Sequence, residues 1–182
     1  MARAVFLDRD GVINRAVIRD GKPYPPRSLA ELELLPGVPE ALQLLHDAGL
    51  LLIVVTNQPD VARGTQTKEA VEAMHDSLRA SLPIDAVRAC YHDGDGCNCR
   101  KPKPGFLFDA QDEFGVELHS SYMVGDRWRD IEAGQRAGCA CLFVDNSYNE
   151  RQPDEPFIRV TSLLHAAQWI IANRLKTESQ HL

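Results

Sequence analysis

Short apolar segments alternate with segments of helical spacing along almost the whole chain, and this alternation limits the possible folds more than any other feature. The apolar runs are rich in β-branched residues and lie at 4–7, 51–55, 86–91, 122–124 and 141–144. The segments with the three-to-four-residue spacing of an amphipathic helix lie at 36–49, 67–82, 104–115, 129–138 and 161–175. Strand and helix in alternation predict an α/β fold, a doubly wound and mainly parallel sheet with functional sites beyond the carboxyl ends of its strands.

The length of the chain suits one domain. Its 182 residues fall within the ~100–200 residues of common single domains, so we expect one domain over 1–182 and a monomer. Residues 15–35 contain several prolines and are expected to form a loop over the end of the first strand. The polar stretch 145–160 is interpreted as a loop before the last helix, and 176–182 as a frayed tail.

Charge and hydropathy exclude two classes of partner. With 20 basic and 26 acidic residues the formal net charge is -6, so the chain has no overall attraction for nucleic acid. No apolar run approaches the roughly 20 residues of a transmembrane helix, and the N-terminus leads into the first apolar run without a signal-peptide pattern. We therefore expect a cytoplasmic protein with no membrane or nucleic-acid partner.

Carboxylates and other polar groups gather where the predicted strands end. Asp8 and Asp10 follow the first strand with one residue between them, so an extended chain would point both to one face. An Asp-Gly turn after a strand is also common in proteins without any function at that place. Further polar groups follow the runs at 51–55 and 122–124, namely Thr56, Asn57 and Gln58, then Asp126 and Asp130.

Such a set of carboxylates suits a cation. Carboxylates gathered at one point repel one another unless a cation neutralises them, and hard oxygen ligands are those of magnesium. The expected ligands are Asp8, Asp126 and the backbone carbonyl of Asp10. Magnesium completes its shell with waters and substrate phosphate, which makes the site a candidate for phosphate chemistry. Lys101 and Thr56 would then offer a positive charge and a hydroxyl donor to phosphoryl oxygens.

Three cysteines and a histidine within ten residues indicate a second metal site. They are Cys90, His92, Cys97 and Cys99. Three sulfurs and one nitrogen are a ligand set that zinc prefers, and because all four positions are filled the site would be structural, a zinc loop over 90–99. The spacing is tighter than that of the usual CxxC pairs, so from spacing alone a group of reactive or exposed thiols is the alternative.

Four segments carry a family resemblance. FLDRDGVIN, VVTNQ, CRKPKPG and VGDRWRDIEAG resemble, in this order, the four motifs of the haloacid dehalogenase-like (HAD-like) phosphohydrolases over roughly residues 4–145. The resemblance implies a Rossmann-like core without a large cap domain and a magnesium-dependent phosphatase. It implies that Asp8 is the nucleophile of an aspartyl-phosphate intermediate and that Asp10 is the general acid and then the base. Thr56 and Lys101 would hold the phosphoryl oxygens, and Asp126 would hold magnesium with Asp8.

The cysteine and histidine segment narrows the resemblance to the branch that acts on heptose bisphosphate and histidinol phosphate, and it implies zinc on the four ligands. Arg100 resembles the residue that reaches the non-reacting part of the substrate. A cation there favours the 7-phosphate of D-glycero-D-manno-heptose 1,7-bisphosphate over histidinol phosphate, whose amine would need carboxylates. The acidic net charge argues against a polynucleotide 3'-phosphatase. The intact pair Asp8 and Asp10 argues against a non-catalytic zinc-stabilised binding module.

Several of these positions also have a structural interpretation. Asp126 and Asp130 would both suit the start of a helix. Arg127 is assigned to a substrate anion, with a solvated side chain as the alternative. Asn57 and Gln58 are assigned to substrate binding, with a simple turn as the alternative.

Two further points concern the neighbours of these motifs. Arg9, between the two aspartates, points to the opposite face of an extended chain and is expected to be structural. Pro59 and Asp60 stand where Ser-Gly follows TNQ in the heptose phosphatases. That segment borders the expected pocket, so the sequence leaves the sugar or alcohol of the substrate open.

Overall fold

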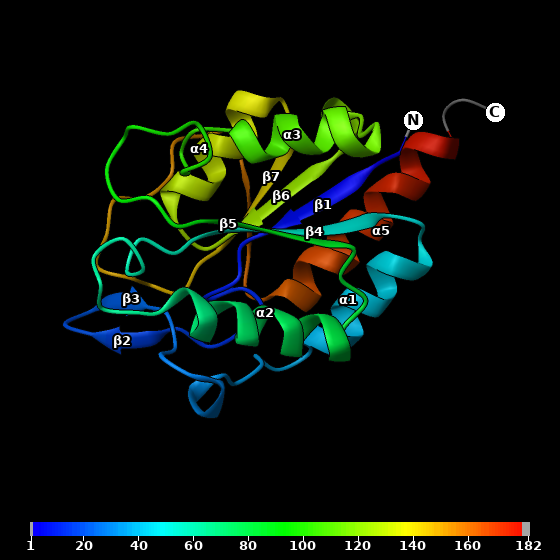
Figure 1. The fold of residues 1–182 in the computed structure, drawn as a ribbon. Helices are drawn as coiled ribbons and strands as arrows, with labels where there is room; N and C mark the ends of the chain where they lie inside the picture. Colours follow the sequence, from blue (N-terminus) through cyan, green and yellow to red (C-terminus); the bar gives the residue numbers. More distant parts are fainter. Residues whose placement is uncertain (1, 180–182) are drawn as a thin grey trace.

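The computed structural model describes residues 2–179, with side chains through residue 173, and its centre is one six-stranded sheet (Figure 1). The strands lie in the order β5-β4-β1-β6-β7-β8, and every pairing between them is parallel. Their bounds are Ala4–Leu7 (β1), Leu51–Asn57 (β4), Ala86–Cys90 (β5), Tyr122–Gly125 (β6), Ala140–Val144 (β7) and Ile158–Val160 (β8). The predicted doubly wound, mainly parallel sheet is therefore confirmed.

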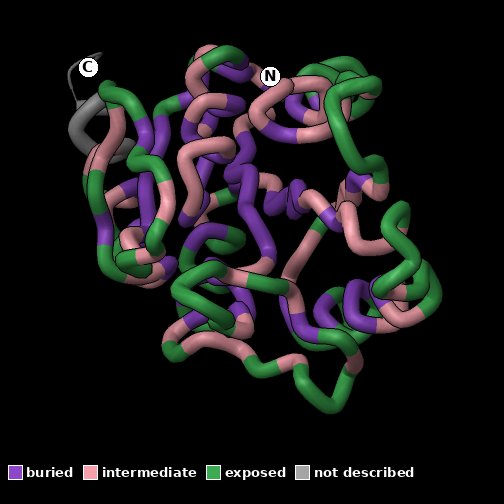
Figure 2. The backbone as a smooth tube through the Cα atoms, turned by 90° about the vertical axis from the view of Figure 1, so that its left-hand side faces the viewer, coloured by how far each residue is buried: buried purple, intermediate pink, exposed green. Residues whose placement is uncertain are grey.

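Helices cover both faces of this sheet. They are α1 (Val38–Asp47), α2 (Lys68–Ser81), α3 (Gly105–Phe114), α4 (Trp128–Ala137) and α5 (Leu163–Ser179), with short 3-10 turns at Leu29–Glu31 and Leu118–Ser120. Successive strand residues point to opposite faces. Leu7 and Val54 pack with α1, α2 and α5, whereas Phe6 and Val55 pack with α3 and α4. Figure 2 shows the central strands buried and the surrounding loops exposed. Burial on both faces explains why the strands are continuous apolar runs.

Local sequence explains where the helices begin and end. The Thr67 hydroxyl accepts a hydrogen bond from the Ala70 amide at the start of α2, which satisfies one of the unpaired N–H groups of the first turn. Gly115 and Gly138 follow α3 and α4 in the left-handed conformation that ends a helix. All five helices begin within two residues of the predicted starts, and the first four also end within two residues of the predicted ends.

The prediction of a plain loop over 15–35 was incomplete, because this segment contains an antiparallel hairpin. Its strands are β2 (Val17–Arg19) and β3 (Lys22–Tyr24). Asp20 and Gly21 connect them, both with positive φ, of 51° and 72°. Two such residues are the preferred connection of a two-residue hairpin, so the Asp-Gly pair was an available signal. Figure 1 shows the hairpin at the end of the sheet toward which β1 points.

Two predictions about the C-terminal part were wrong. Residues 145–160 are not a continuous loop, because 158–160 form β8, the strand at the edge of the sheet. Its three residues are too few to show a strand pattern in the sequence. The last helix continues through 176–179, where a frayed tail was expected; residues 180–182 lie outside the described residues. No helix in the described part is long and apolar enough to cross a membrane. No large cap domain interrupts the core between residues 2 and 179.

Candidate active site

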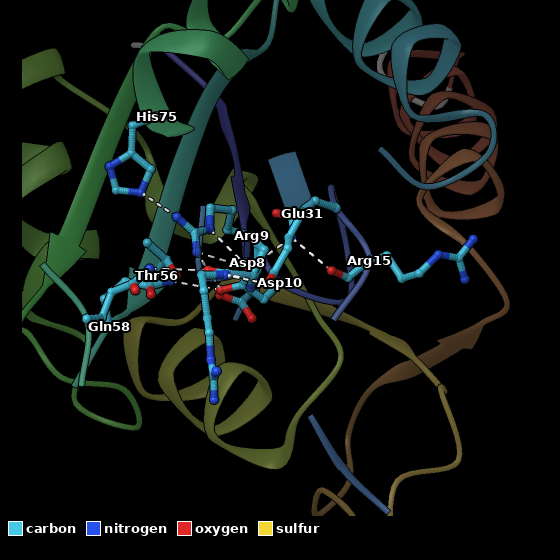
Figure 3. Close-up of polar contacts among 12 residues, drawn as sticks. Asp8, Arg9, Asp10, Arg15, Glu31, Thr56, Gln58 and His75 are labelled. Carbon is cyan, nitrogen blue, oxygen red and sulfur yellow. Dashed lines mark hydrogen bonds and ion pairs between the residues drawn. The ribbon is translucent and has the colours of Figure 1, made fainter. Parts of the chain in front are cut away.

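The carboxyl ends of three neighbouring strands bring the predicted residues together. Strand β1 lies between β4 and β6, so Asp8, Thr56 and Asp126, which stand at the ends of these strands, meet at one edge of the sheet. The side chain of Lys101 reaches the same place from the segment after β5. Figure 3 shows Asp8, Asp10 and Thr56 gathered at this edge. The parallel topology, rather than nearness in sequence, builds the site.

A buried lysine joins two of the carboxylates. The Lys101 ammonium donates to Asp8 Oδ1 at 2.8 Å and to the Val55 carbonyl at 2.7 Å, and it lies 2.7 Å from Asp130 Oδ1. Lys101 is 3% exposed, and its three hydrogens each have an acceptor. A phosphoryl oxygen that contacted Lys101 would therefore have to share or replace one of these acceptors.

The electrostatics of the site follow from burial and crowding. Asp8, Asp126 and Asp130 are buried, and one oxygen from each lies within 4.8 Å of the others. Burial, with the charges of Asp130 and Asp10, raises the pKa of Asp8 to about 6 although Lys101 opposes the shift. Burial and the charges of Asp8 and Asp130 raise the pKa of Asp126 well above its ordinary value. Burial alone would lower the pKa of Lys101, but the charges of Asp130 and Asp8 raise it.

The donor set fits a hard cation. Asp126 Oδ1 is buried and has no hydrogen-bond partner among the described residues, although an unpaired buried carboxylate oxygen is costly. Three clustered carboxylates with one ammonium leave excess negative charge that a divalent cation would balance. Oxygen ligands of this kind suit magnesium.

Asp130 serves both the helix and the site, and the two interpretations offered by the sequence are compatible. Its carboxylate accepts a hydrogen bond from the Arg127 amide at 3.0 Å, at the start of α4. Its other oxygen pairs with Lys101. Asp126 does not cap the helix, since Arg127 occupies the N-cap position.

Asp10 is held by donors on both of its oxygens. Arg9 donates to Oδ1 and Oδ2, each at 3.1 Å, Asn14 donates to Oδ1 at 2.9 Å, and Gln58 donates to Oδ2 at 2.8 Å. Arg9 is fully buried and also lies 3.0 Å from Nε2 of His75 (Figure 3). Arg9 therefore has the expected structural role, and it exerts that role on the candidate catalytic residue Asp10. The alternation of side chains in an extended chain does not predict this contact.

Two residues that the sequence assigns to substrate binding, Asn57 and Gln58, make hydrogen bonds within the site. Gln58 is completely buried, and its side-chain amide donates to Asp10 and, at 2.9 Å, to the Thr56 hydroxyl. It therefore lies behind the pocket and positions other residues. The Asn57 side chain both donates to the Lys101 carbonyl and accepts from the Lys101 amide, at 3.0 and 3.1 Å. Although Asn57 reaches the pocket wall, its amide is used to fix the backbone of Lys101.

A pocket opens above these groups, and its rim is rich in basic side chains. Hairpin residues Lys22, Pro23 and Tyr24, with the segment after β4, form part of its wall. The basic residues of the wall are Lys22, Arg63, Arg100, Lys101, Arg127 and Arg129. Arg63, Arg129 and Lys22 were not predicted, because they come from three separate segments that only the fold brings to one pocket.

The two predicted arginines both line this pocket. Arg100 donates to the His92 carbonyl at 2.8 Å and lies 3.8 Å from Asp93, so the cysteine-rich loop holds it at the rim. Arg127 pairs with Glu150 across the pocket wall. Neither is a freely solvated side chain.

The cysteine and histidine ligands converge at the end of β5. Cys90 Sγ lies 3.7 Å from Cys97 Sγ and 3.1 Å from Cys99 Sγ, and His92 Nδ1 lies 3.6 Å from Cys90 and 3.4 Å from Cys99. A tetrahedral site with Zn–S bonds of about 2.3 Å would separate its sulfurs by about 3.8 Å. All five cysteines are free. The cluster therefore has a geometry that zinc fits.

Comparisons with known proteins agree with this site. Residues 98–165 match a family model described as HAD-hydrolase-like. The chain is 36% identical to D-glycero-beta-D-manno-heptose-1,7-bisphosphate 7-phosphatase of Pseudomonas aeruginosa, over 86% of this chain and 89% of that protein. It is 31% identical to the corresponding alpha-anomer phosphatase of Photorhabdus laumondii, over 92% and 96%.

Solved structures show the same relationship. A heptose 1,7-bisphosphate phosphatase of B. bronchiseptica, complexed with magnesium and phosphate, superposes with a TM-score of 0.81 at 31% identity, over 94% of this chain and 99% of that one. A HAD-like phosphatase of Mesorhizobium loti superposes with a TM-score of 0.74 at 32% identity, over 94% and 87%. On these similarities in sequence and structure, the chain belongs to the HAD-like hydrolase family.

Proposed function

We propose that this chain is a magnesium-dependent phosphatase that removes the 7-phosphate from D-glycero-D-manno-heptose 1,7-bisphosphate. The observation that carries the proposal is the cluster of Asp8, Asp126 and Asp130 beyond the ends of β1 and β6, with the buried Lys101 paired to Asp8 and Asp130. Relatives that match most of the chain are named as phosphatases of this substrate. Phosphoryl transfer is catalysed chiefly by such positioned charges.

In the proposed first step, an Asp8 oxygen forms a bond to phosphorus as the bond from phosphorus to the 7-oxygen breaks. Asp10 gives its proton to that leaving oxygen. In the second step Asp10 takes a proton from water, the water oxygen bonds to phosphorus, and the bond between phosphorus and Asp8 breaks. Asp10 thereby regains the proton that the next turnover requires. Gln58, Arg9 and Asn14 hold Asp10 for both steps.

Other residues of the site would hold the phosphoryl group and the cation. Thr56 already accepts from Gln58, which leaves its own hydroxyl hydrogen for a phosphoryl oxygen. Asp8, Asp126 and the backbone carbonyl of Asp10 would hold magnesium, which supplies positive charge that screens the phosphoryl oxygens from the attacking carboxylate. Lys101, held by Asp130, adds a fixed cation beside Asp8.

The charge of the pocket supports a substrate with a second anionic group. Arg100 and Arg129 lie on its wall with Lys22. Histidinol phosphate, whose amine is cationic, would meet these residues unfavourably. The net charge of -6 continues to argue against a polynucleotide 3'-phosphatase. The presence of Asp8 and Asp10 in one hydrogen-bonded site argues against a binding module without activity.

We also propose that zinc on Cys90, His92, Cys97 and Cys99 stabilises the loop that presents Arg100 and Lys101. A site with four protein ligands has no open position for substrate, so its role would be structural. The single domain over 1–182, its action as a monomer and its location in the cytoplasm are further parts of the proposal. They rest on the continuous six-stranded core, the length of the chain and the reduced state that zinc thiolates require.

A phosphate-release assay with magnesium tests the function. The substrates are the alpha and beta anomers of heptose 1,7-bisphosphate, histidinol phosphate and a 3'-phosphorylated oligonucleotide, with phosphorus NMR to identify the product. We expect a heptose bisphosphate to be preferred at least 10-fold in kcat/KM, with heptose 1-phosphate as product. Asp8→Asn is the matched inactive control. A preference for histidinol phosphate or the oligonucleotide, or release from the 1-position, would contradict the proposal.

A further inference from the structure

The two oxygens of Asp126 have different surroundings. The Asn146 side-chain amide donates to Asp126 Oδ2 at 3.3 Å. The Tyr148 oxygen lies next to the same carboxylate, since a Cβ placed on Gly11 would be 1.8 Å from Asp126 Oδ2 and 2.7 Å from the Tyr148 oxygen. Oδ1 has no hydrogen-bond partner in the described structure. Oδ2 therefore has a partner in the protein, whereas Oδ1 is buried without one among the described residues.

The residues that hold Oδ2 are themselves fixed. The Asn146 side-chain nitrogen lies 2.9 Å from the Gly11 carbonyl and 3.1 Å from the Tyr148 oxygen, so its two hydrogens are shared among these two acceptors and Asp126 Oδ2. Gly11 has a φ of 91°, and a Cβ there would lie 1.8 Å from Asp126 Oδ2 and 2.7 Å from the Tyr148 oxygen. The lack of a side chain at Gly11 thus permits this close packing. The segments that follow β1, β6 and β7 therefore meet at Asp126 Oδ2.

We infer that Tyr148 and Asn146 are positioning residues that hold Asp126 by Oδ2 and turn Oδ1 toward the magnesium ion. The inference rests on the proposed function, in which Asp126 is a magnesium ligand. Hydrogen bonds to the second atom of a ligating group commonly fix its orientation, and their loss weakens metal affinity.

Magnesium affinity is the direct test. Isothermal titration of the magnesium-free protein with MgCl2 should give a Kd for Tyr148→Phe about 10-fold above that of the unsubstituted protein. Asn146→Ala should raise the Kd in the same direction. The double variant should raise it by less than the product of the single effects, because both side chains act on one oxygen. At saturating magnesium, kcat of Tyr148→Phe should return to within about 2-fold of the original value.

Tyr122→Phe is the matched control. It removes a hydroxyl from β6, the strand that leads to Asp126, but about four residues or 13 Å away along an extended chain, and its magnesium Kd should not change. A Kd for Tyr148→Phe and Asn146→Ala within 2-fold of the original overturns the inference, whatever happens to kcat or Tm. If the unsubstituted chain binds no magnesium at millimolar concentration, the proposed metal site fails as well. Normal magnesium binding with unchanged variants leaves the proposed function standing and rejects only the inference.

Discussion

Replacement of Lys101 by methionine should destabilise the protein strongly, and the loss should depend on pH. Methionine keeps most of the length of the side chain but removes the charge that lies 2.8 Å from Asp8 and 2.7 Å from Asp130. At an effective dielectric constant near 20, a pair at this distance attracts by about 6 kcal/mol. Desolvation of the lysine opposes that attraction, so we expect a net loss of about 3–5 kcal/mol, the usual cost of breaking a buried ion pair.

The pH dependence follows from the carboxylates left behind. With Lys101 present, the pKa of Asp8 is already about 6, against an ordinary value of 3.8, and without the lysine it should rise further. Above 3.8 the folded state then binds more protons than the unfolded state, so the free energy of unfolding falls as pH rises through the folded-state pKa. The loss in Lys101→Met should therefore be largest near pH 8 and clearly smaller near pH 5.

Urea unfolding followed by circular dichroism, in magnesium-free buffer at pH 8 and pH 5, measures both quantities. Lys68→Met, at the exposed start of α2, is the control and should change the free energy of unfolding by less than about 1 kcal/mol. Adding Asp130→Asn to Lys101→Met should recover more than about 1 kcal/mol at pH 8, because one unpaired buried carboxylate is removed. A loss below about 1 kcal/mol at pH 8, or an equal loss at both pH values, would refute this account of the site.

Three further outcomes are expected. Asp8→Asn should abolish phosphate release in the assay above while the circular dichroism spectrum stays native, and retained turnover would reject Asp8 as the nucleophile. Removal of zinc should loosen 88–105, measured by amide hydrogen exchange, and lower kcat through Lys101 before magnesium affinity falls; unchanged exchange would contradict a structural zinc. Burial and Arg9 lower the pKa of His75 from 6.5, so the unfolded state binds the extra proton and stability should fall as pH drops below about 6.5. His75→Gln should reduce that fall, as seen in urea midpoints between pH 7.5 and 5, and an unchanged slope would show that His75 does not contribute.

The family, the sheet and the main site residues were predictable because their signals are local. Buried parallel strands must be continuous apolar runs, and the helices between them must show a period near 3.6. Three of the four motifs begin within such strands and continue past their ends, and the fourth, CRKPKPG, lies in the segment after β5. Short elements were not predicted, among them the strands of the hairpin at 17–24, β8 at 158–160 and the two 3-10 turns, since three residues do not define a period.

The roles of single polar side chains were less predictable, because hydrogen-bond partners come from distant segments. The sequence assigns Gln58 and Asn57 to substrate binding, and it does not reveal that they also hold Asp10 and the backbone of Lys101. Tyr148 has no neighbouring motif at all, and its relation to Asp126 exists only because β7 lies beside β6.

The sequence by itself thus determined the fold class and which residue types stand at the strand ends, since both depend on patterns within a few residues. The tertiary structure decided which of these residues face the pocket and which stand behind it, and it placed Lys101 between Asp8 and Asp130. The physical reason is that a buried polar group must find its partner wherever the packed chain supplies one, irrespective of separation in sequence.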